Sequence, residues 1–450
     1  MRALLAGLAL LIPAAAHAAP TTPGDLVTER AVLVMRHGIR APLNGEVPEG
    51  TRTDRPWPVW PVAQSVVTPH GKRALEIVAE SDRRLLASRG LLDAAGCPKA
   101  GSVSIVANAS PRAIASAAAY VRGFAPQCAI KISHLEEPQA DPIFEPLRAK
   151  ATAFDADAAV ADINRSTGGM ARLAARDRKE LALLNRVLGC GEADCLPPAA
   201  PAIAARDRDI PLSGPIRSAS GIAQVLLLQY LEGMPVQQVG WGRIDAAGLQ
   251  RLGRLHADLF TVYTRPPYMA AHQASALGRR ILDTLDHGPA FELLMGHDTN
   301  VTALAATLRV DLCGEGYATN DVPPGGAILI ERLRDARSGL RYVRASYRTQ
   351  PPQALRGLGT QVSLTPLRLP GCAKAPAATM SSPLHSGSAW RSDHLEGDRK
   401  TGRHCGRRGA RREKDGGRPQ ERGSTSTIQV MPNLSASMPY SGDQAEGPIG

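Results

Sequence analysis

The sequence predicts an α/β protein: a mixed, largely parallel sheet with helices on both faces, and an all-helical segment inserted between its parts. Short apolar runs of strand length occur at 31–35, 102–107 and 291–295, and each breaks off into polar residues. Helical patterns separate these runs, as in βα units that build a parallel sheet. From 141 to 256 the strand-like runs vanish and alanine-rich helical patterns dominate, which indicates the insertion.

The chain has 450 residues, of which 43% are hydrophobic, so it is long enough for two or three domains. We expect a discontinuous α/β domain at 19–140 and 257–375, and a helical cap domain at 141–256. The remaining segment, 376–450, is rich in Gly, Ser, Arg and Pro and lacks a sustained apolar period. This composition predicts a disordered or aberrant C-terminal tail.

The first eighteen residues have the three parts of a secretory signal peptide. Arg2 supplies the positive end, 3–12 is an apolar run too short to span a bilayer, and 16–18 is a small-x-small cleavage site. Cleavage after Ala18 would release a periplasmic or secreted protein. No later run reaches about 18 apolar residues, so we expect no membrane span.

Export permits disulfides, and the chain has seven cysteines. A Cys97–Cys128 bond would close a loop of about thirty residues, worth roughly 3–4 kcal/mol in the chain-entropy model. A Cys190–Cys195 bond would pin one short loop. Cys313 and Cys372 are left to pair with each other or with other partners. No Cys/His spacing suggests a zinc site.

The formal net charge of +11 fits an anionic substrate, but the arginines are scattered through helices as well as the motifs. Aromatic residues make up 4% of the chain, and no basic stripe with interleaved aromatics occurs. We therefore expect a small-molecule substrate and no nucleic-acid partner. A monomer is also expected, although the sequence carries no signal for the oligomeric state.

The first motif, AVLVMRHGIRAP at 31–42, is a buried strand that turns abruptly polar. Charge that follows a buried strand lies at the edge of an open α/β sheet where ligands bind. Arg36 and Arg40 carry guanidinium forks that match phosphate oxygens, and Gly38 lets the backbone approach a ligand closely. Between two cations the imidazole of His37 should stay neutral at moderate pH, because like charge lowers its pKa. The motif predicts a nucleophilic histidine in a phosphate cradle.

The elements after the first motif follow in order. Thr68 as cap and Pro69 in the first turn begin a helix. The strand at 102–107 ends shortly before Arg112, so strand ends that lie side by side would bring Arg112 and Arg36 to one phosphate. A third strand is expected at 128–132. Further helices are expected at 151–163, 171–188, 216–231, 249–262 and 274–285.

The second motif is FELLMGHDTN at 291–300, an apolar strand that again breaks into polar residues before a helix at 301–308. Phosphoryl transfer to a histidine needs an acid that protonates the leaving alcohol, and Asp298 can supply that proton. His297 can donate a hydrogen bond to a phosphate oxygen, aided by the helix N-terminus. Alternating patterns at 327–332 and 340–347 then predict a hairpin at the sheet edge.

The two motifs together resemble the histidine acid phosphatases, a branch of the histidine phosphatase superfamily, over about 26–372. RHGIRAP is similar to the family's RHGxRxP signature, and GHDTN resembles its proton-donor motif. The resemblance implies a phosphoglycerate-mutase-like fold, attack by His37 to form a phosphohistidine, protonation of the leaving group by Asp298, and no cofactor or metal. The phosphate-binding residues that it implies are Arg36, Arg40, Arg112 and His297.

The sequence departs from the family at two places. Ala113 follows Arg112 where the family usually has threonine, and the cysteine-bearing turn and helix that usually close the domain are missing. Signals for the substrate conflict. Leu43 is found in glucose-1-phosphatase-like members, Thr299 with Asn300 in phytase-like members, and Gln224 stands where the latter have glutamate. Phytate and sugar phosphates both stay open.

Two other functions compete with acid phosphatase. RHG is shared with the phosphomutase branch, although the signal peptide argues against a cytosolic substrate. A non-catalytic periplasmic phosphate-binding module is the second rival, but it would not need the acid Asp298.

Overall fold

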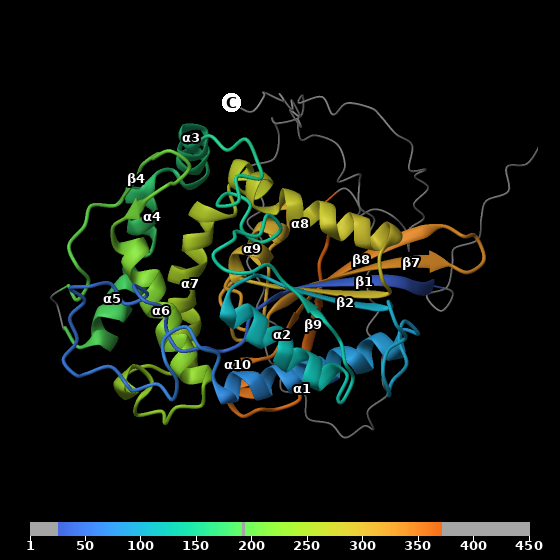
Figure 1. Cartoon of the computed structure of the whole chain (residues 1–450). Helices are drawn as coiled ribbons and strands as arrows, with labels where there is room; N and C mark the ends of the chain where they lie inside the picture. Colours follow the sequence, from blue (N-terminus) through green and yellow to red (C-terminus); the bar gives the residue numbers. More distant parts are fainter. Residues whose placement is uncertain (1–25, 191–193, 371–450) are drawn as a thin grey trace, which may run out of the picture.

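A computed structural model describes residues 26–190 and 194–370 (Figure 1). The predictions of a signal peptide at 1–18, of a tail at 376–450 and of a bond to Cys372 lie outside the described residues. Within the described ranges, none of the helices is long and apolar enough to cross a lipid bilayer.

A seven-stranded mixed sheet forms the centre of the molecule, in the order β3-β2-β6-β1-β7-β8-β9. Its parallel half consists of β3 (Ile132–Ser133), β2 (Val103–Ala107), β6 (Phe291–Gly296) and β1 (Leu26–Arg36). Its antiparallel half consists of β7 (Ala327–Asp335), β8 (Arg341–Thr349) and β9 (Ser363–Pro366). The predicted fold class, a mixed α/β sheet with a parallel centre, is confirmed.

Two details of the sheet differ from the prediction. The hairpin β7–β8 lies inside the sheet, because β7 pairs with β1 and β9 covers β8, so the prediction of an edge position is wrong. The third strand is the two-residue β3, which begins at the last residue of the predicted 128–132. The sequence does not show that β9 covers the hairpin, because this short strand has no alternating run of its own.

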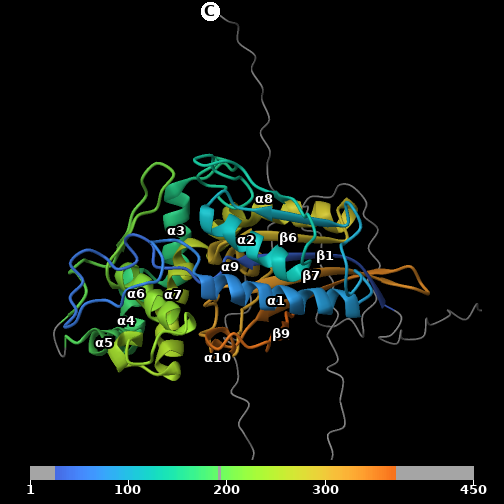
Figure 2. The same ribbon diagram turned by 60° about the horizontal axis from the view of Figure 1, so that its bottom comes forward.

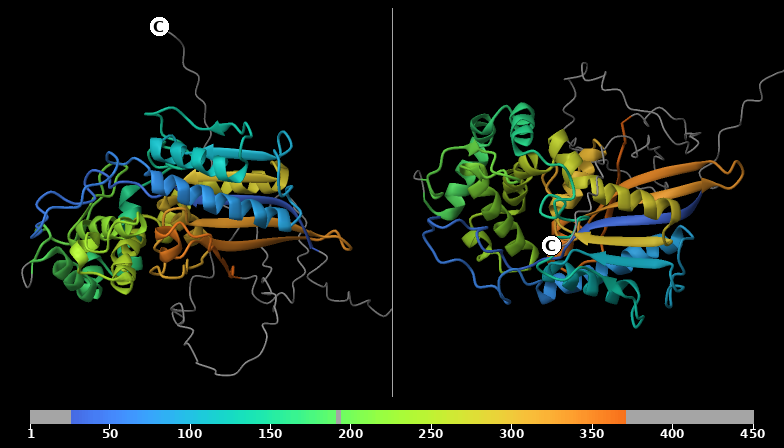
Figure 3. Two further views of the ribbon diagram at one scale, coloured as in Figure 1. Left: turned by 90° about the horizontal axis from the view of Figure 1, so that it is seen from below. Right: turned by 45° about the horizontal axis from the view of Figure 1, so that its top comes forward.

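Alternate side chains of β1 pack against helices on opposite faces of the sheet, which is why this strand is apolar from Ala31 to Met35. Leu33 and Met35 contact the cluster that includes α1 (Pro69–Ser88) and α2 (Pro111–Phe124). Val32 and Val34 contact the cluster that includes α8 (Pro267–His287) and α9 (Asp298–Thr307). Figures 2 and 3 show α1 and α2 on one side of the strands and α8 on the other.

A group of helices stands at one end of the sheet (Figure 1). Its members are α3 (Ala156–Thr167), α4 (Met170–Arg176), α5 (Arg178–Leu188), α6 (Pro215–Leu231) and α7 (Ala246–Tyr263). The helix expected at 171–188 is two helices that meet at the buried Asp177. A small hairpin, β4 (Ala202–Ile203) with β5 (Leu212–Ser213), occurs where no strand was expected.

Two short helical segments complete the described structure. They are a 3-10 turn at Val239–Gly242 and α10 (Pro352–Arg356). The division into an α/β domain and a cap domain at 141 and 256 stays a prediction, and its second boundary falls within α7.

Two disulfides are present in the described residues, and both were predicted. Cys97–Cys128 joins the segment before β2 to the segment after α2. Cys190–Cys195 closes a loop beyond α5.

Candidate active site

The carboxyl ends of three neighbouring parallel strands bring both motifs together. In the β1–β6 register Arg36 lies opposite Gly296, and the His37 amide donates to the Gly296 carbonyl at 3.0 Å. The Asn108 amide, just after β2, donates to the Met295 carbonyl at 2.9 Å. Segments separated by 70 to 260 positions in the chain therefore meet at one sheet edge, the edge where ligands bind in α/β proteins.

His37 is buried, with 3% of its surface exposed. Its Nδ1 lies 2.9 Å from the Gly38 carbonyl oxygen. A carbonyl only accepts, so the proton is on Nδ1 and the lone pair is on Nε2. Burial lowers the pKa of His37 well below its usual value, and Arg40 and Arg36 lower it further. The imidazole is thus neutral in a cationic setting, as the sequence predicted, and its role as the nucleophile stays a prediction.

Arg36 is anchored on three sides. Its Nη1 donates to the Val322 carbonyl, and its Nη2 donates to Gln224 Oε1 at 2.7 Å. The same Nη2 forms an ion pair with Asp298 Oδ2 at 3.1 Å. The Nε of Arg36 is buried without a hydrogen-bond partner in the described structure.

Arg40 faces a carboxylate. Its Nη1 and Nη2 donate to the two oxygens of Glu46 at 2.9 and 2.5 Å, and the Leu43 amide also donates to Glu46. Guanidinium and carboxylate thus form a bidentate pair. A phosphate that binds Arg40 must share or replace this partner.

His297 lies in a chain of side-chain hydrogen bonds. Asn108 donates through Nδ2 to Glu145 at 3.0 Å, and its Oδ1 accepts from the Ser110 amide at 3.0 Å, which sets the orientation of its amide. The same Oδ1 lies 3.0 Å from His297 Nε2, so this nitrogen carries the proton. Arg112 Nη2 then donates to Nδ1 at 3.4 Å.

Both ring nitrogens of His297 are therefore engaged in this arrangement. Burial and Arg112 lower the pKa of His297 to about 3, so the ring is neutral. To donate to a phosphate oxygen, His297 must give up its hydrogen bond to Asn108. Its ring lies 5.5 Å from that of His37, edge to face.

Asp298 begins α9, and its Oδ1 accepts from the Thr299 amide at 2.9 Å. Burial would raise the pKa of Asp298, but Arg36, followed by His256 and His297, lowers it to about 2. The carboxylate is therefore ionised in the free protein. The structure thus brings all six predicted site residues to one place, but each of the charged ones already has a protein partner.

The local motifs missed several residues that contact the site. Glu46 holds Arg40, Asn108 holds His297, and Gln224 on α6 holds Arg36. His256 on α7 faces Asp298, and Asp321 faces His256. Of these, only Gln224 had a signal in the sequence, as a position of interest. The others belong to loops and helices whose place at the site depends on tertiary packing.

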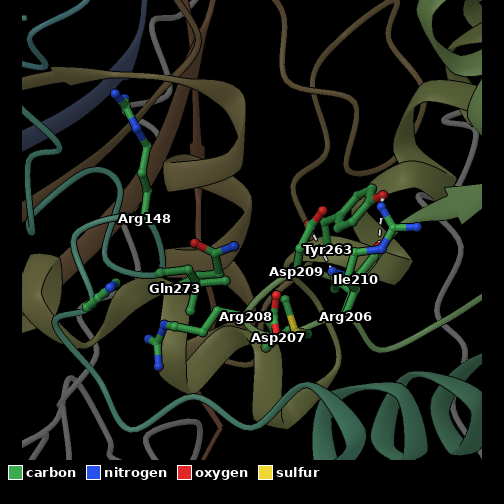
Figure 4. A pocket seen from close by; sticks show the side chains of 11 residues that line it. Arg148, Arg206, Asp207, Arg208, Asp209, Ile210, Tyr263 and Gln273 are labelled. Atoms are coloured by element: carbon green, nitrogen blue, oxygen red, sulfur yellow. Dashed lines mark hydrogen bonds between the residues drawn. The ribbon is translucent and has the colours of Figure 1, made fainter. Parts of the chain in front are cut away.

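Two cavities lie near this region. One of about 170 Å³ adjoins the predicted site; the residues that line it include Asn108, Arg112, Glu137, Glu145 and His297. The other, of about 470 Å³, contains none of the six predicted site residues and shares only Arg148 with the first. Figure 4 shows it, with Arg206, Arg208, Tyr263 and Gln273 on its wall. Across the described part of the chain, no three His, Cys, Asp or Glu side chains are grouped so that they could hold a metal ion.

Comparison with known proteins agrees with this geometry. Residues 28–348 match the model of the histidine phosphatase superfamily (branch 2). Phytase AppA of Escherichia coli is 30% identical over 415 residues, which cover 83% of this chain and 95% of the relative. Glucose-1-phosphatase of Salmonella typhimurium is 27% identical over 394 residues, covering 82% and 92%.

Solved structures are similar as well. A Hafnia alvei phytase in complex with tartrate superposes with a TM-score of 0.73 at 28% identity, covering 79% of this chain and 95% of that one. A Klebsiella phytase superposes with a TM-score of 0.71 at 28% identity, covering 79% and 92%. The family expected from RHGIRAP and GHDTN is confirmed, and the chain belongs to branch 2 of the histidine phosphatase superfamily.

Proposed function

We propose that this protein is an exported acid phosphatase that hydrolyses phosphomonoesters through a phosphohistidine on His37. The observation that carries the proposal is a buried neutral imidazole, protonated on Nδ1, at a sheet edge that also holds three arginines and Asp298. Export rests on the signal-peptide pattern at 1–18.

In the first half of the reaction, His37 Nε2 attacks phosphorus while the ester P–O bond breaks. Arg36, Arg40, Arg112 and His297 hold the equatorial oxygens, where negative charge develops. These side chains exchange the partners Glu46, Asn108 and Asp298 for phosphate oxygens. The exchange explains why each cation is pre-oriented but paired in the free protein.

Asp298 protonates the leaving oxygen. In the free protein its pKa is about 2, so a proton must arrive when substrate binds. A phosphate dianion beside Asp298 raises the pKa of the carboxyl, because like charge disfavours ionisation, and it also competes for Arg36. In the second half, water attacks the phosphohistidine, and Asp298 accepts the proton of that water.

Phytate and sugar phosphates are the proposed substrate classes, because relatives of similar identity are named for both. The test is phosphate release at about pH 5 from phytate, glucose 1-phosphate and p-nitrophenyl phosphate, with and without EDTA. We expect release that EDTA does not abolish, and the ranking of rates identifies the substrate class.

His37→Ala is the decisive variant in the same assay. It should lose activity by a factor of at least about 10³, since it removes the imidazole that attacks phosphorus in the proposed mechanism. Full activity of this variant, or complete loss of wild-type activity with EDTA, would contradict the mechanism. Phosphate binding without turnover by the wild-type protein would instead indicate the phosphate-binding module.

A further inference from the structure

His256 and Asp321 are two buried titratable residues next to the site that have no part in the mechanism above. His256 lies on α7 and Asp321 lies in the segment before β7; 7% and 2% of their surfaces are exposed. Buried ionisable groups cost free energy unless they are paired. We therefore looked at which groups pair with His256 and Asp321.

His256 lies between Asp321 and Asp298 and faces both of them. Asp321 Oδ1 lies 2.8 Å from His256 Nδ1, and His256 Nε2 lies 3.8 Å from Asp298 Oδ2. Since the Asp321 carboxylate accepts, His256 carries a proton on Nδ1 and directs Nε2 at Asp298.

Packing holds the imidazole in this position. The ring of Phe260, one helical turn further along α7, stacks edge to face on His256 at 4.9 Å. A Cβ at Gly253 would lie 2.4 Å from Asp321 Oδ2. Only glycine at 253 therefore lets Asp321 approach α7 closely enough to orient His256.

His256 Nε2 and Asp298 Oδ2, 3.8 Å apart, can share either no proton or one proton. With no proton between them, the lone pair of His256 Nε2 would face the negative Asp298 Oδ2. With one proton, the pair is either an imidazolium beside a carboxylate or a neutral imidazole beside a carboxylic acid. The gap is wide for a hydrogen bond, so transfer needs a small side-chain rotation or a bridging water.

Other charged and titratable side chains surround the pair of His256 and Asp298. Arg36, from β1, is 3.1 Å from Asp298 and favours the carboxylate. His297 precedes Asp298 on the same segment. The phenols of Tyr317 and Tyr347 lie near Asp321, and the pKa of each is raised by burial, so both are neutral.

We propose that His256, oriented by Asp321, is a positioning residue that stores the proton Asp298 delivers. The inference rests on the proposed phosphatase function and adds to it. As His37 Nε2 bonds to phosphorus, the ester P–O bond breaks and its electron pair stays on oxygen. That oxygen takes the proton of Asp298 Oδ2, and His256 Nε2–H replaces it. In hydrolysis, the proton of the attacking water passes through Asp298 back to His256.

The need for such a store follows from the acidity of Asp298. With a pKa of about 2, only about one carboxyl in a thousand is protonated at pH 5 in the free protein. A proton held on His256 Nε2, which lies 3.8 Å from Asp298 Oδ2, stands beside the carboxylate before the substrate arrives. When phosphate binds, only a short transfer is then required.

Leaving groups that differ in their need for a proton test the inference. p-Nitrophenolate leaves without protonation, whereas the alkoxide of β-glycerophosphate must be protonated. For each substrate, kcat/KM is measured for the wild type, His256→Gln and Asp321→Asn, from pH 4 to 7. His272→Gln is the matched control, because His272 on α8 also bonds through Nδ1, to Thr152 at 2.9 Å, but is not among the groups that contact the predicted site.

We expect His256→Gln to lower kcat/KM for β-glycerophosphate by about 10-fold or more, and for p-nitrophenyl phosphate by less than about 3-fold. The alkaline limb for β-glycerophosphate should move to lower pH. Asp321→Asn should show the same pattern more weakly, and His272→Gln should show neither change.

Equal losses for both substrates in His256→Gln and in Asp321→Asn would overturn the inference and indicate a structural role only. If His256→Gln fails to fold, Asp321→Asn decides, because it keeps the imidazole and its packing. A wild-type protein that hydrolyses neither substrate would overturn the proposed function itself, and the inference with it.

Discussion

Gly71, in the first turn of α1, controls how closely this helix approaches the first motif. A Cβ at this position would lie 2.3 Å from the Ile39 carbonyl oxygen and 3.0 Å from its carbonyl carbon. The Thr68 amide donates to the same carbonyl at 3.1 Å, and the Gly71 amide donates to the Thr68 hydroxyl at 2.9 Å. Gly71→Ala therefore forces the new Cβ against the backbone of the segment that carries His37 and Arg40.

The magnitude follows from this overlap. Ordinary contact of a Cβ with oxygen begins near 3.4 Å, so about 1 Å of backbone movement is needed. Overpacking of this kind costs about 1–3 kcal/mol of unfolding free energy. A displacement of about 1 Å at a catalytic group can cost about 10²-fold in rate. Gly71→Ala should thus lose stability and kcat/KM together.

Gly278, within α8, provides a matched control. A Cβ there meets no atom within 4 Å, so Gly278→Ala should stabilise the protein by about 0.5–1 kcal/mol through helix propensity and leave activity unchanged. Urea unfolding and kcat/KM for p-nitrophenyl phosphate measure both effects. If Gly71→Ala were as stable and as active as Gly278→Ala, the close approach of α1 would not position the motif.

Three further predictions concern titration and covalent bonds. Because the pKa of Asp298 is lowered to about 2, its ionised form stabilises the fold above the unfolded pKa of about 4. This contribution is lost as the pH falls from about 4 to about 2, so unfolding free energy should fall less steeply there in Asp298→Asn. His297, with its pKa lowered to about 3 by burial and by Arg112, should show no NMR titration between pH 5 and 8; a midpoint near 6.5 would contradict the assigned hydrogen bonds. Replacing both Cys97 and Cys128, which are 31 positions apart, with serine should cost roughly 3–4 kcal/mol in thermal or urea unfolding, and an unchanged midpoint would contradict the entropic estimate.

The position of the candidate site was predictable because two short local patterns indicate it. An apolar strand that breaks into charge at 36–40, and another at 297–298, must meet if the strands are parallel neighbours. In the structure the two strands are parallel neighbours, and Arg36 lies opposite Gly296. Arg112 followed from the same reasoning, since β2 lies beside β6.

The boundaries of several elements were not predictable from local pattern. The apolar period at 171–188 continues across Asp177, yet the helix breaks at this buried residue, which lies near Arg176 and Arg254. Similarly, β7 lies next to β1 inside the sheet, and only the pairing of distant strands places it there.

By itself the sequence indicated which side chains are candidates for the chemistry: a nucleophile, an acid and the cations, each at the end of a strand or the start of a helix. Tertiary structure alone decided how those groups are held before substrate arrives. Glu46 on Arg40, Gln224 on Arg36 and His256 beside Asp298 come from a loop and from two helices with no motif of their own. The physical reason is that charge and hydrogen bonding act over a few ångströms in space, whatever the separation along the chain.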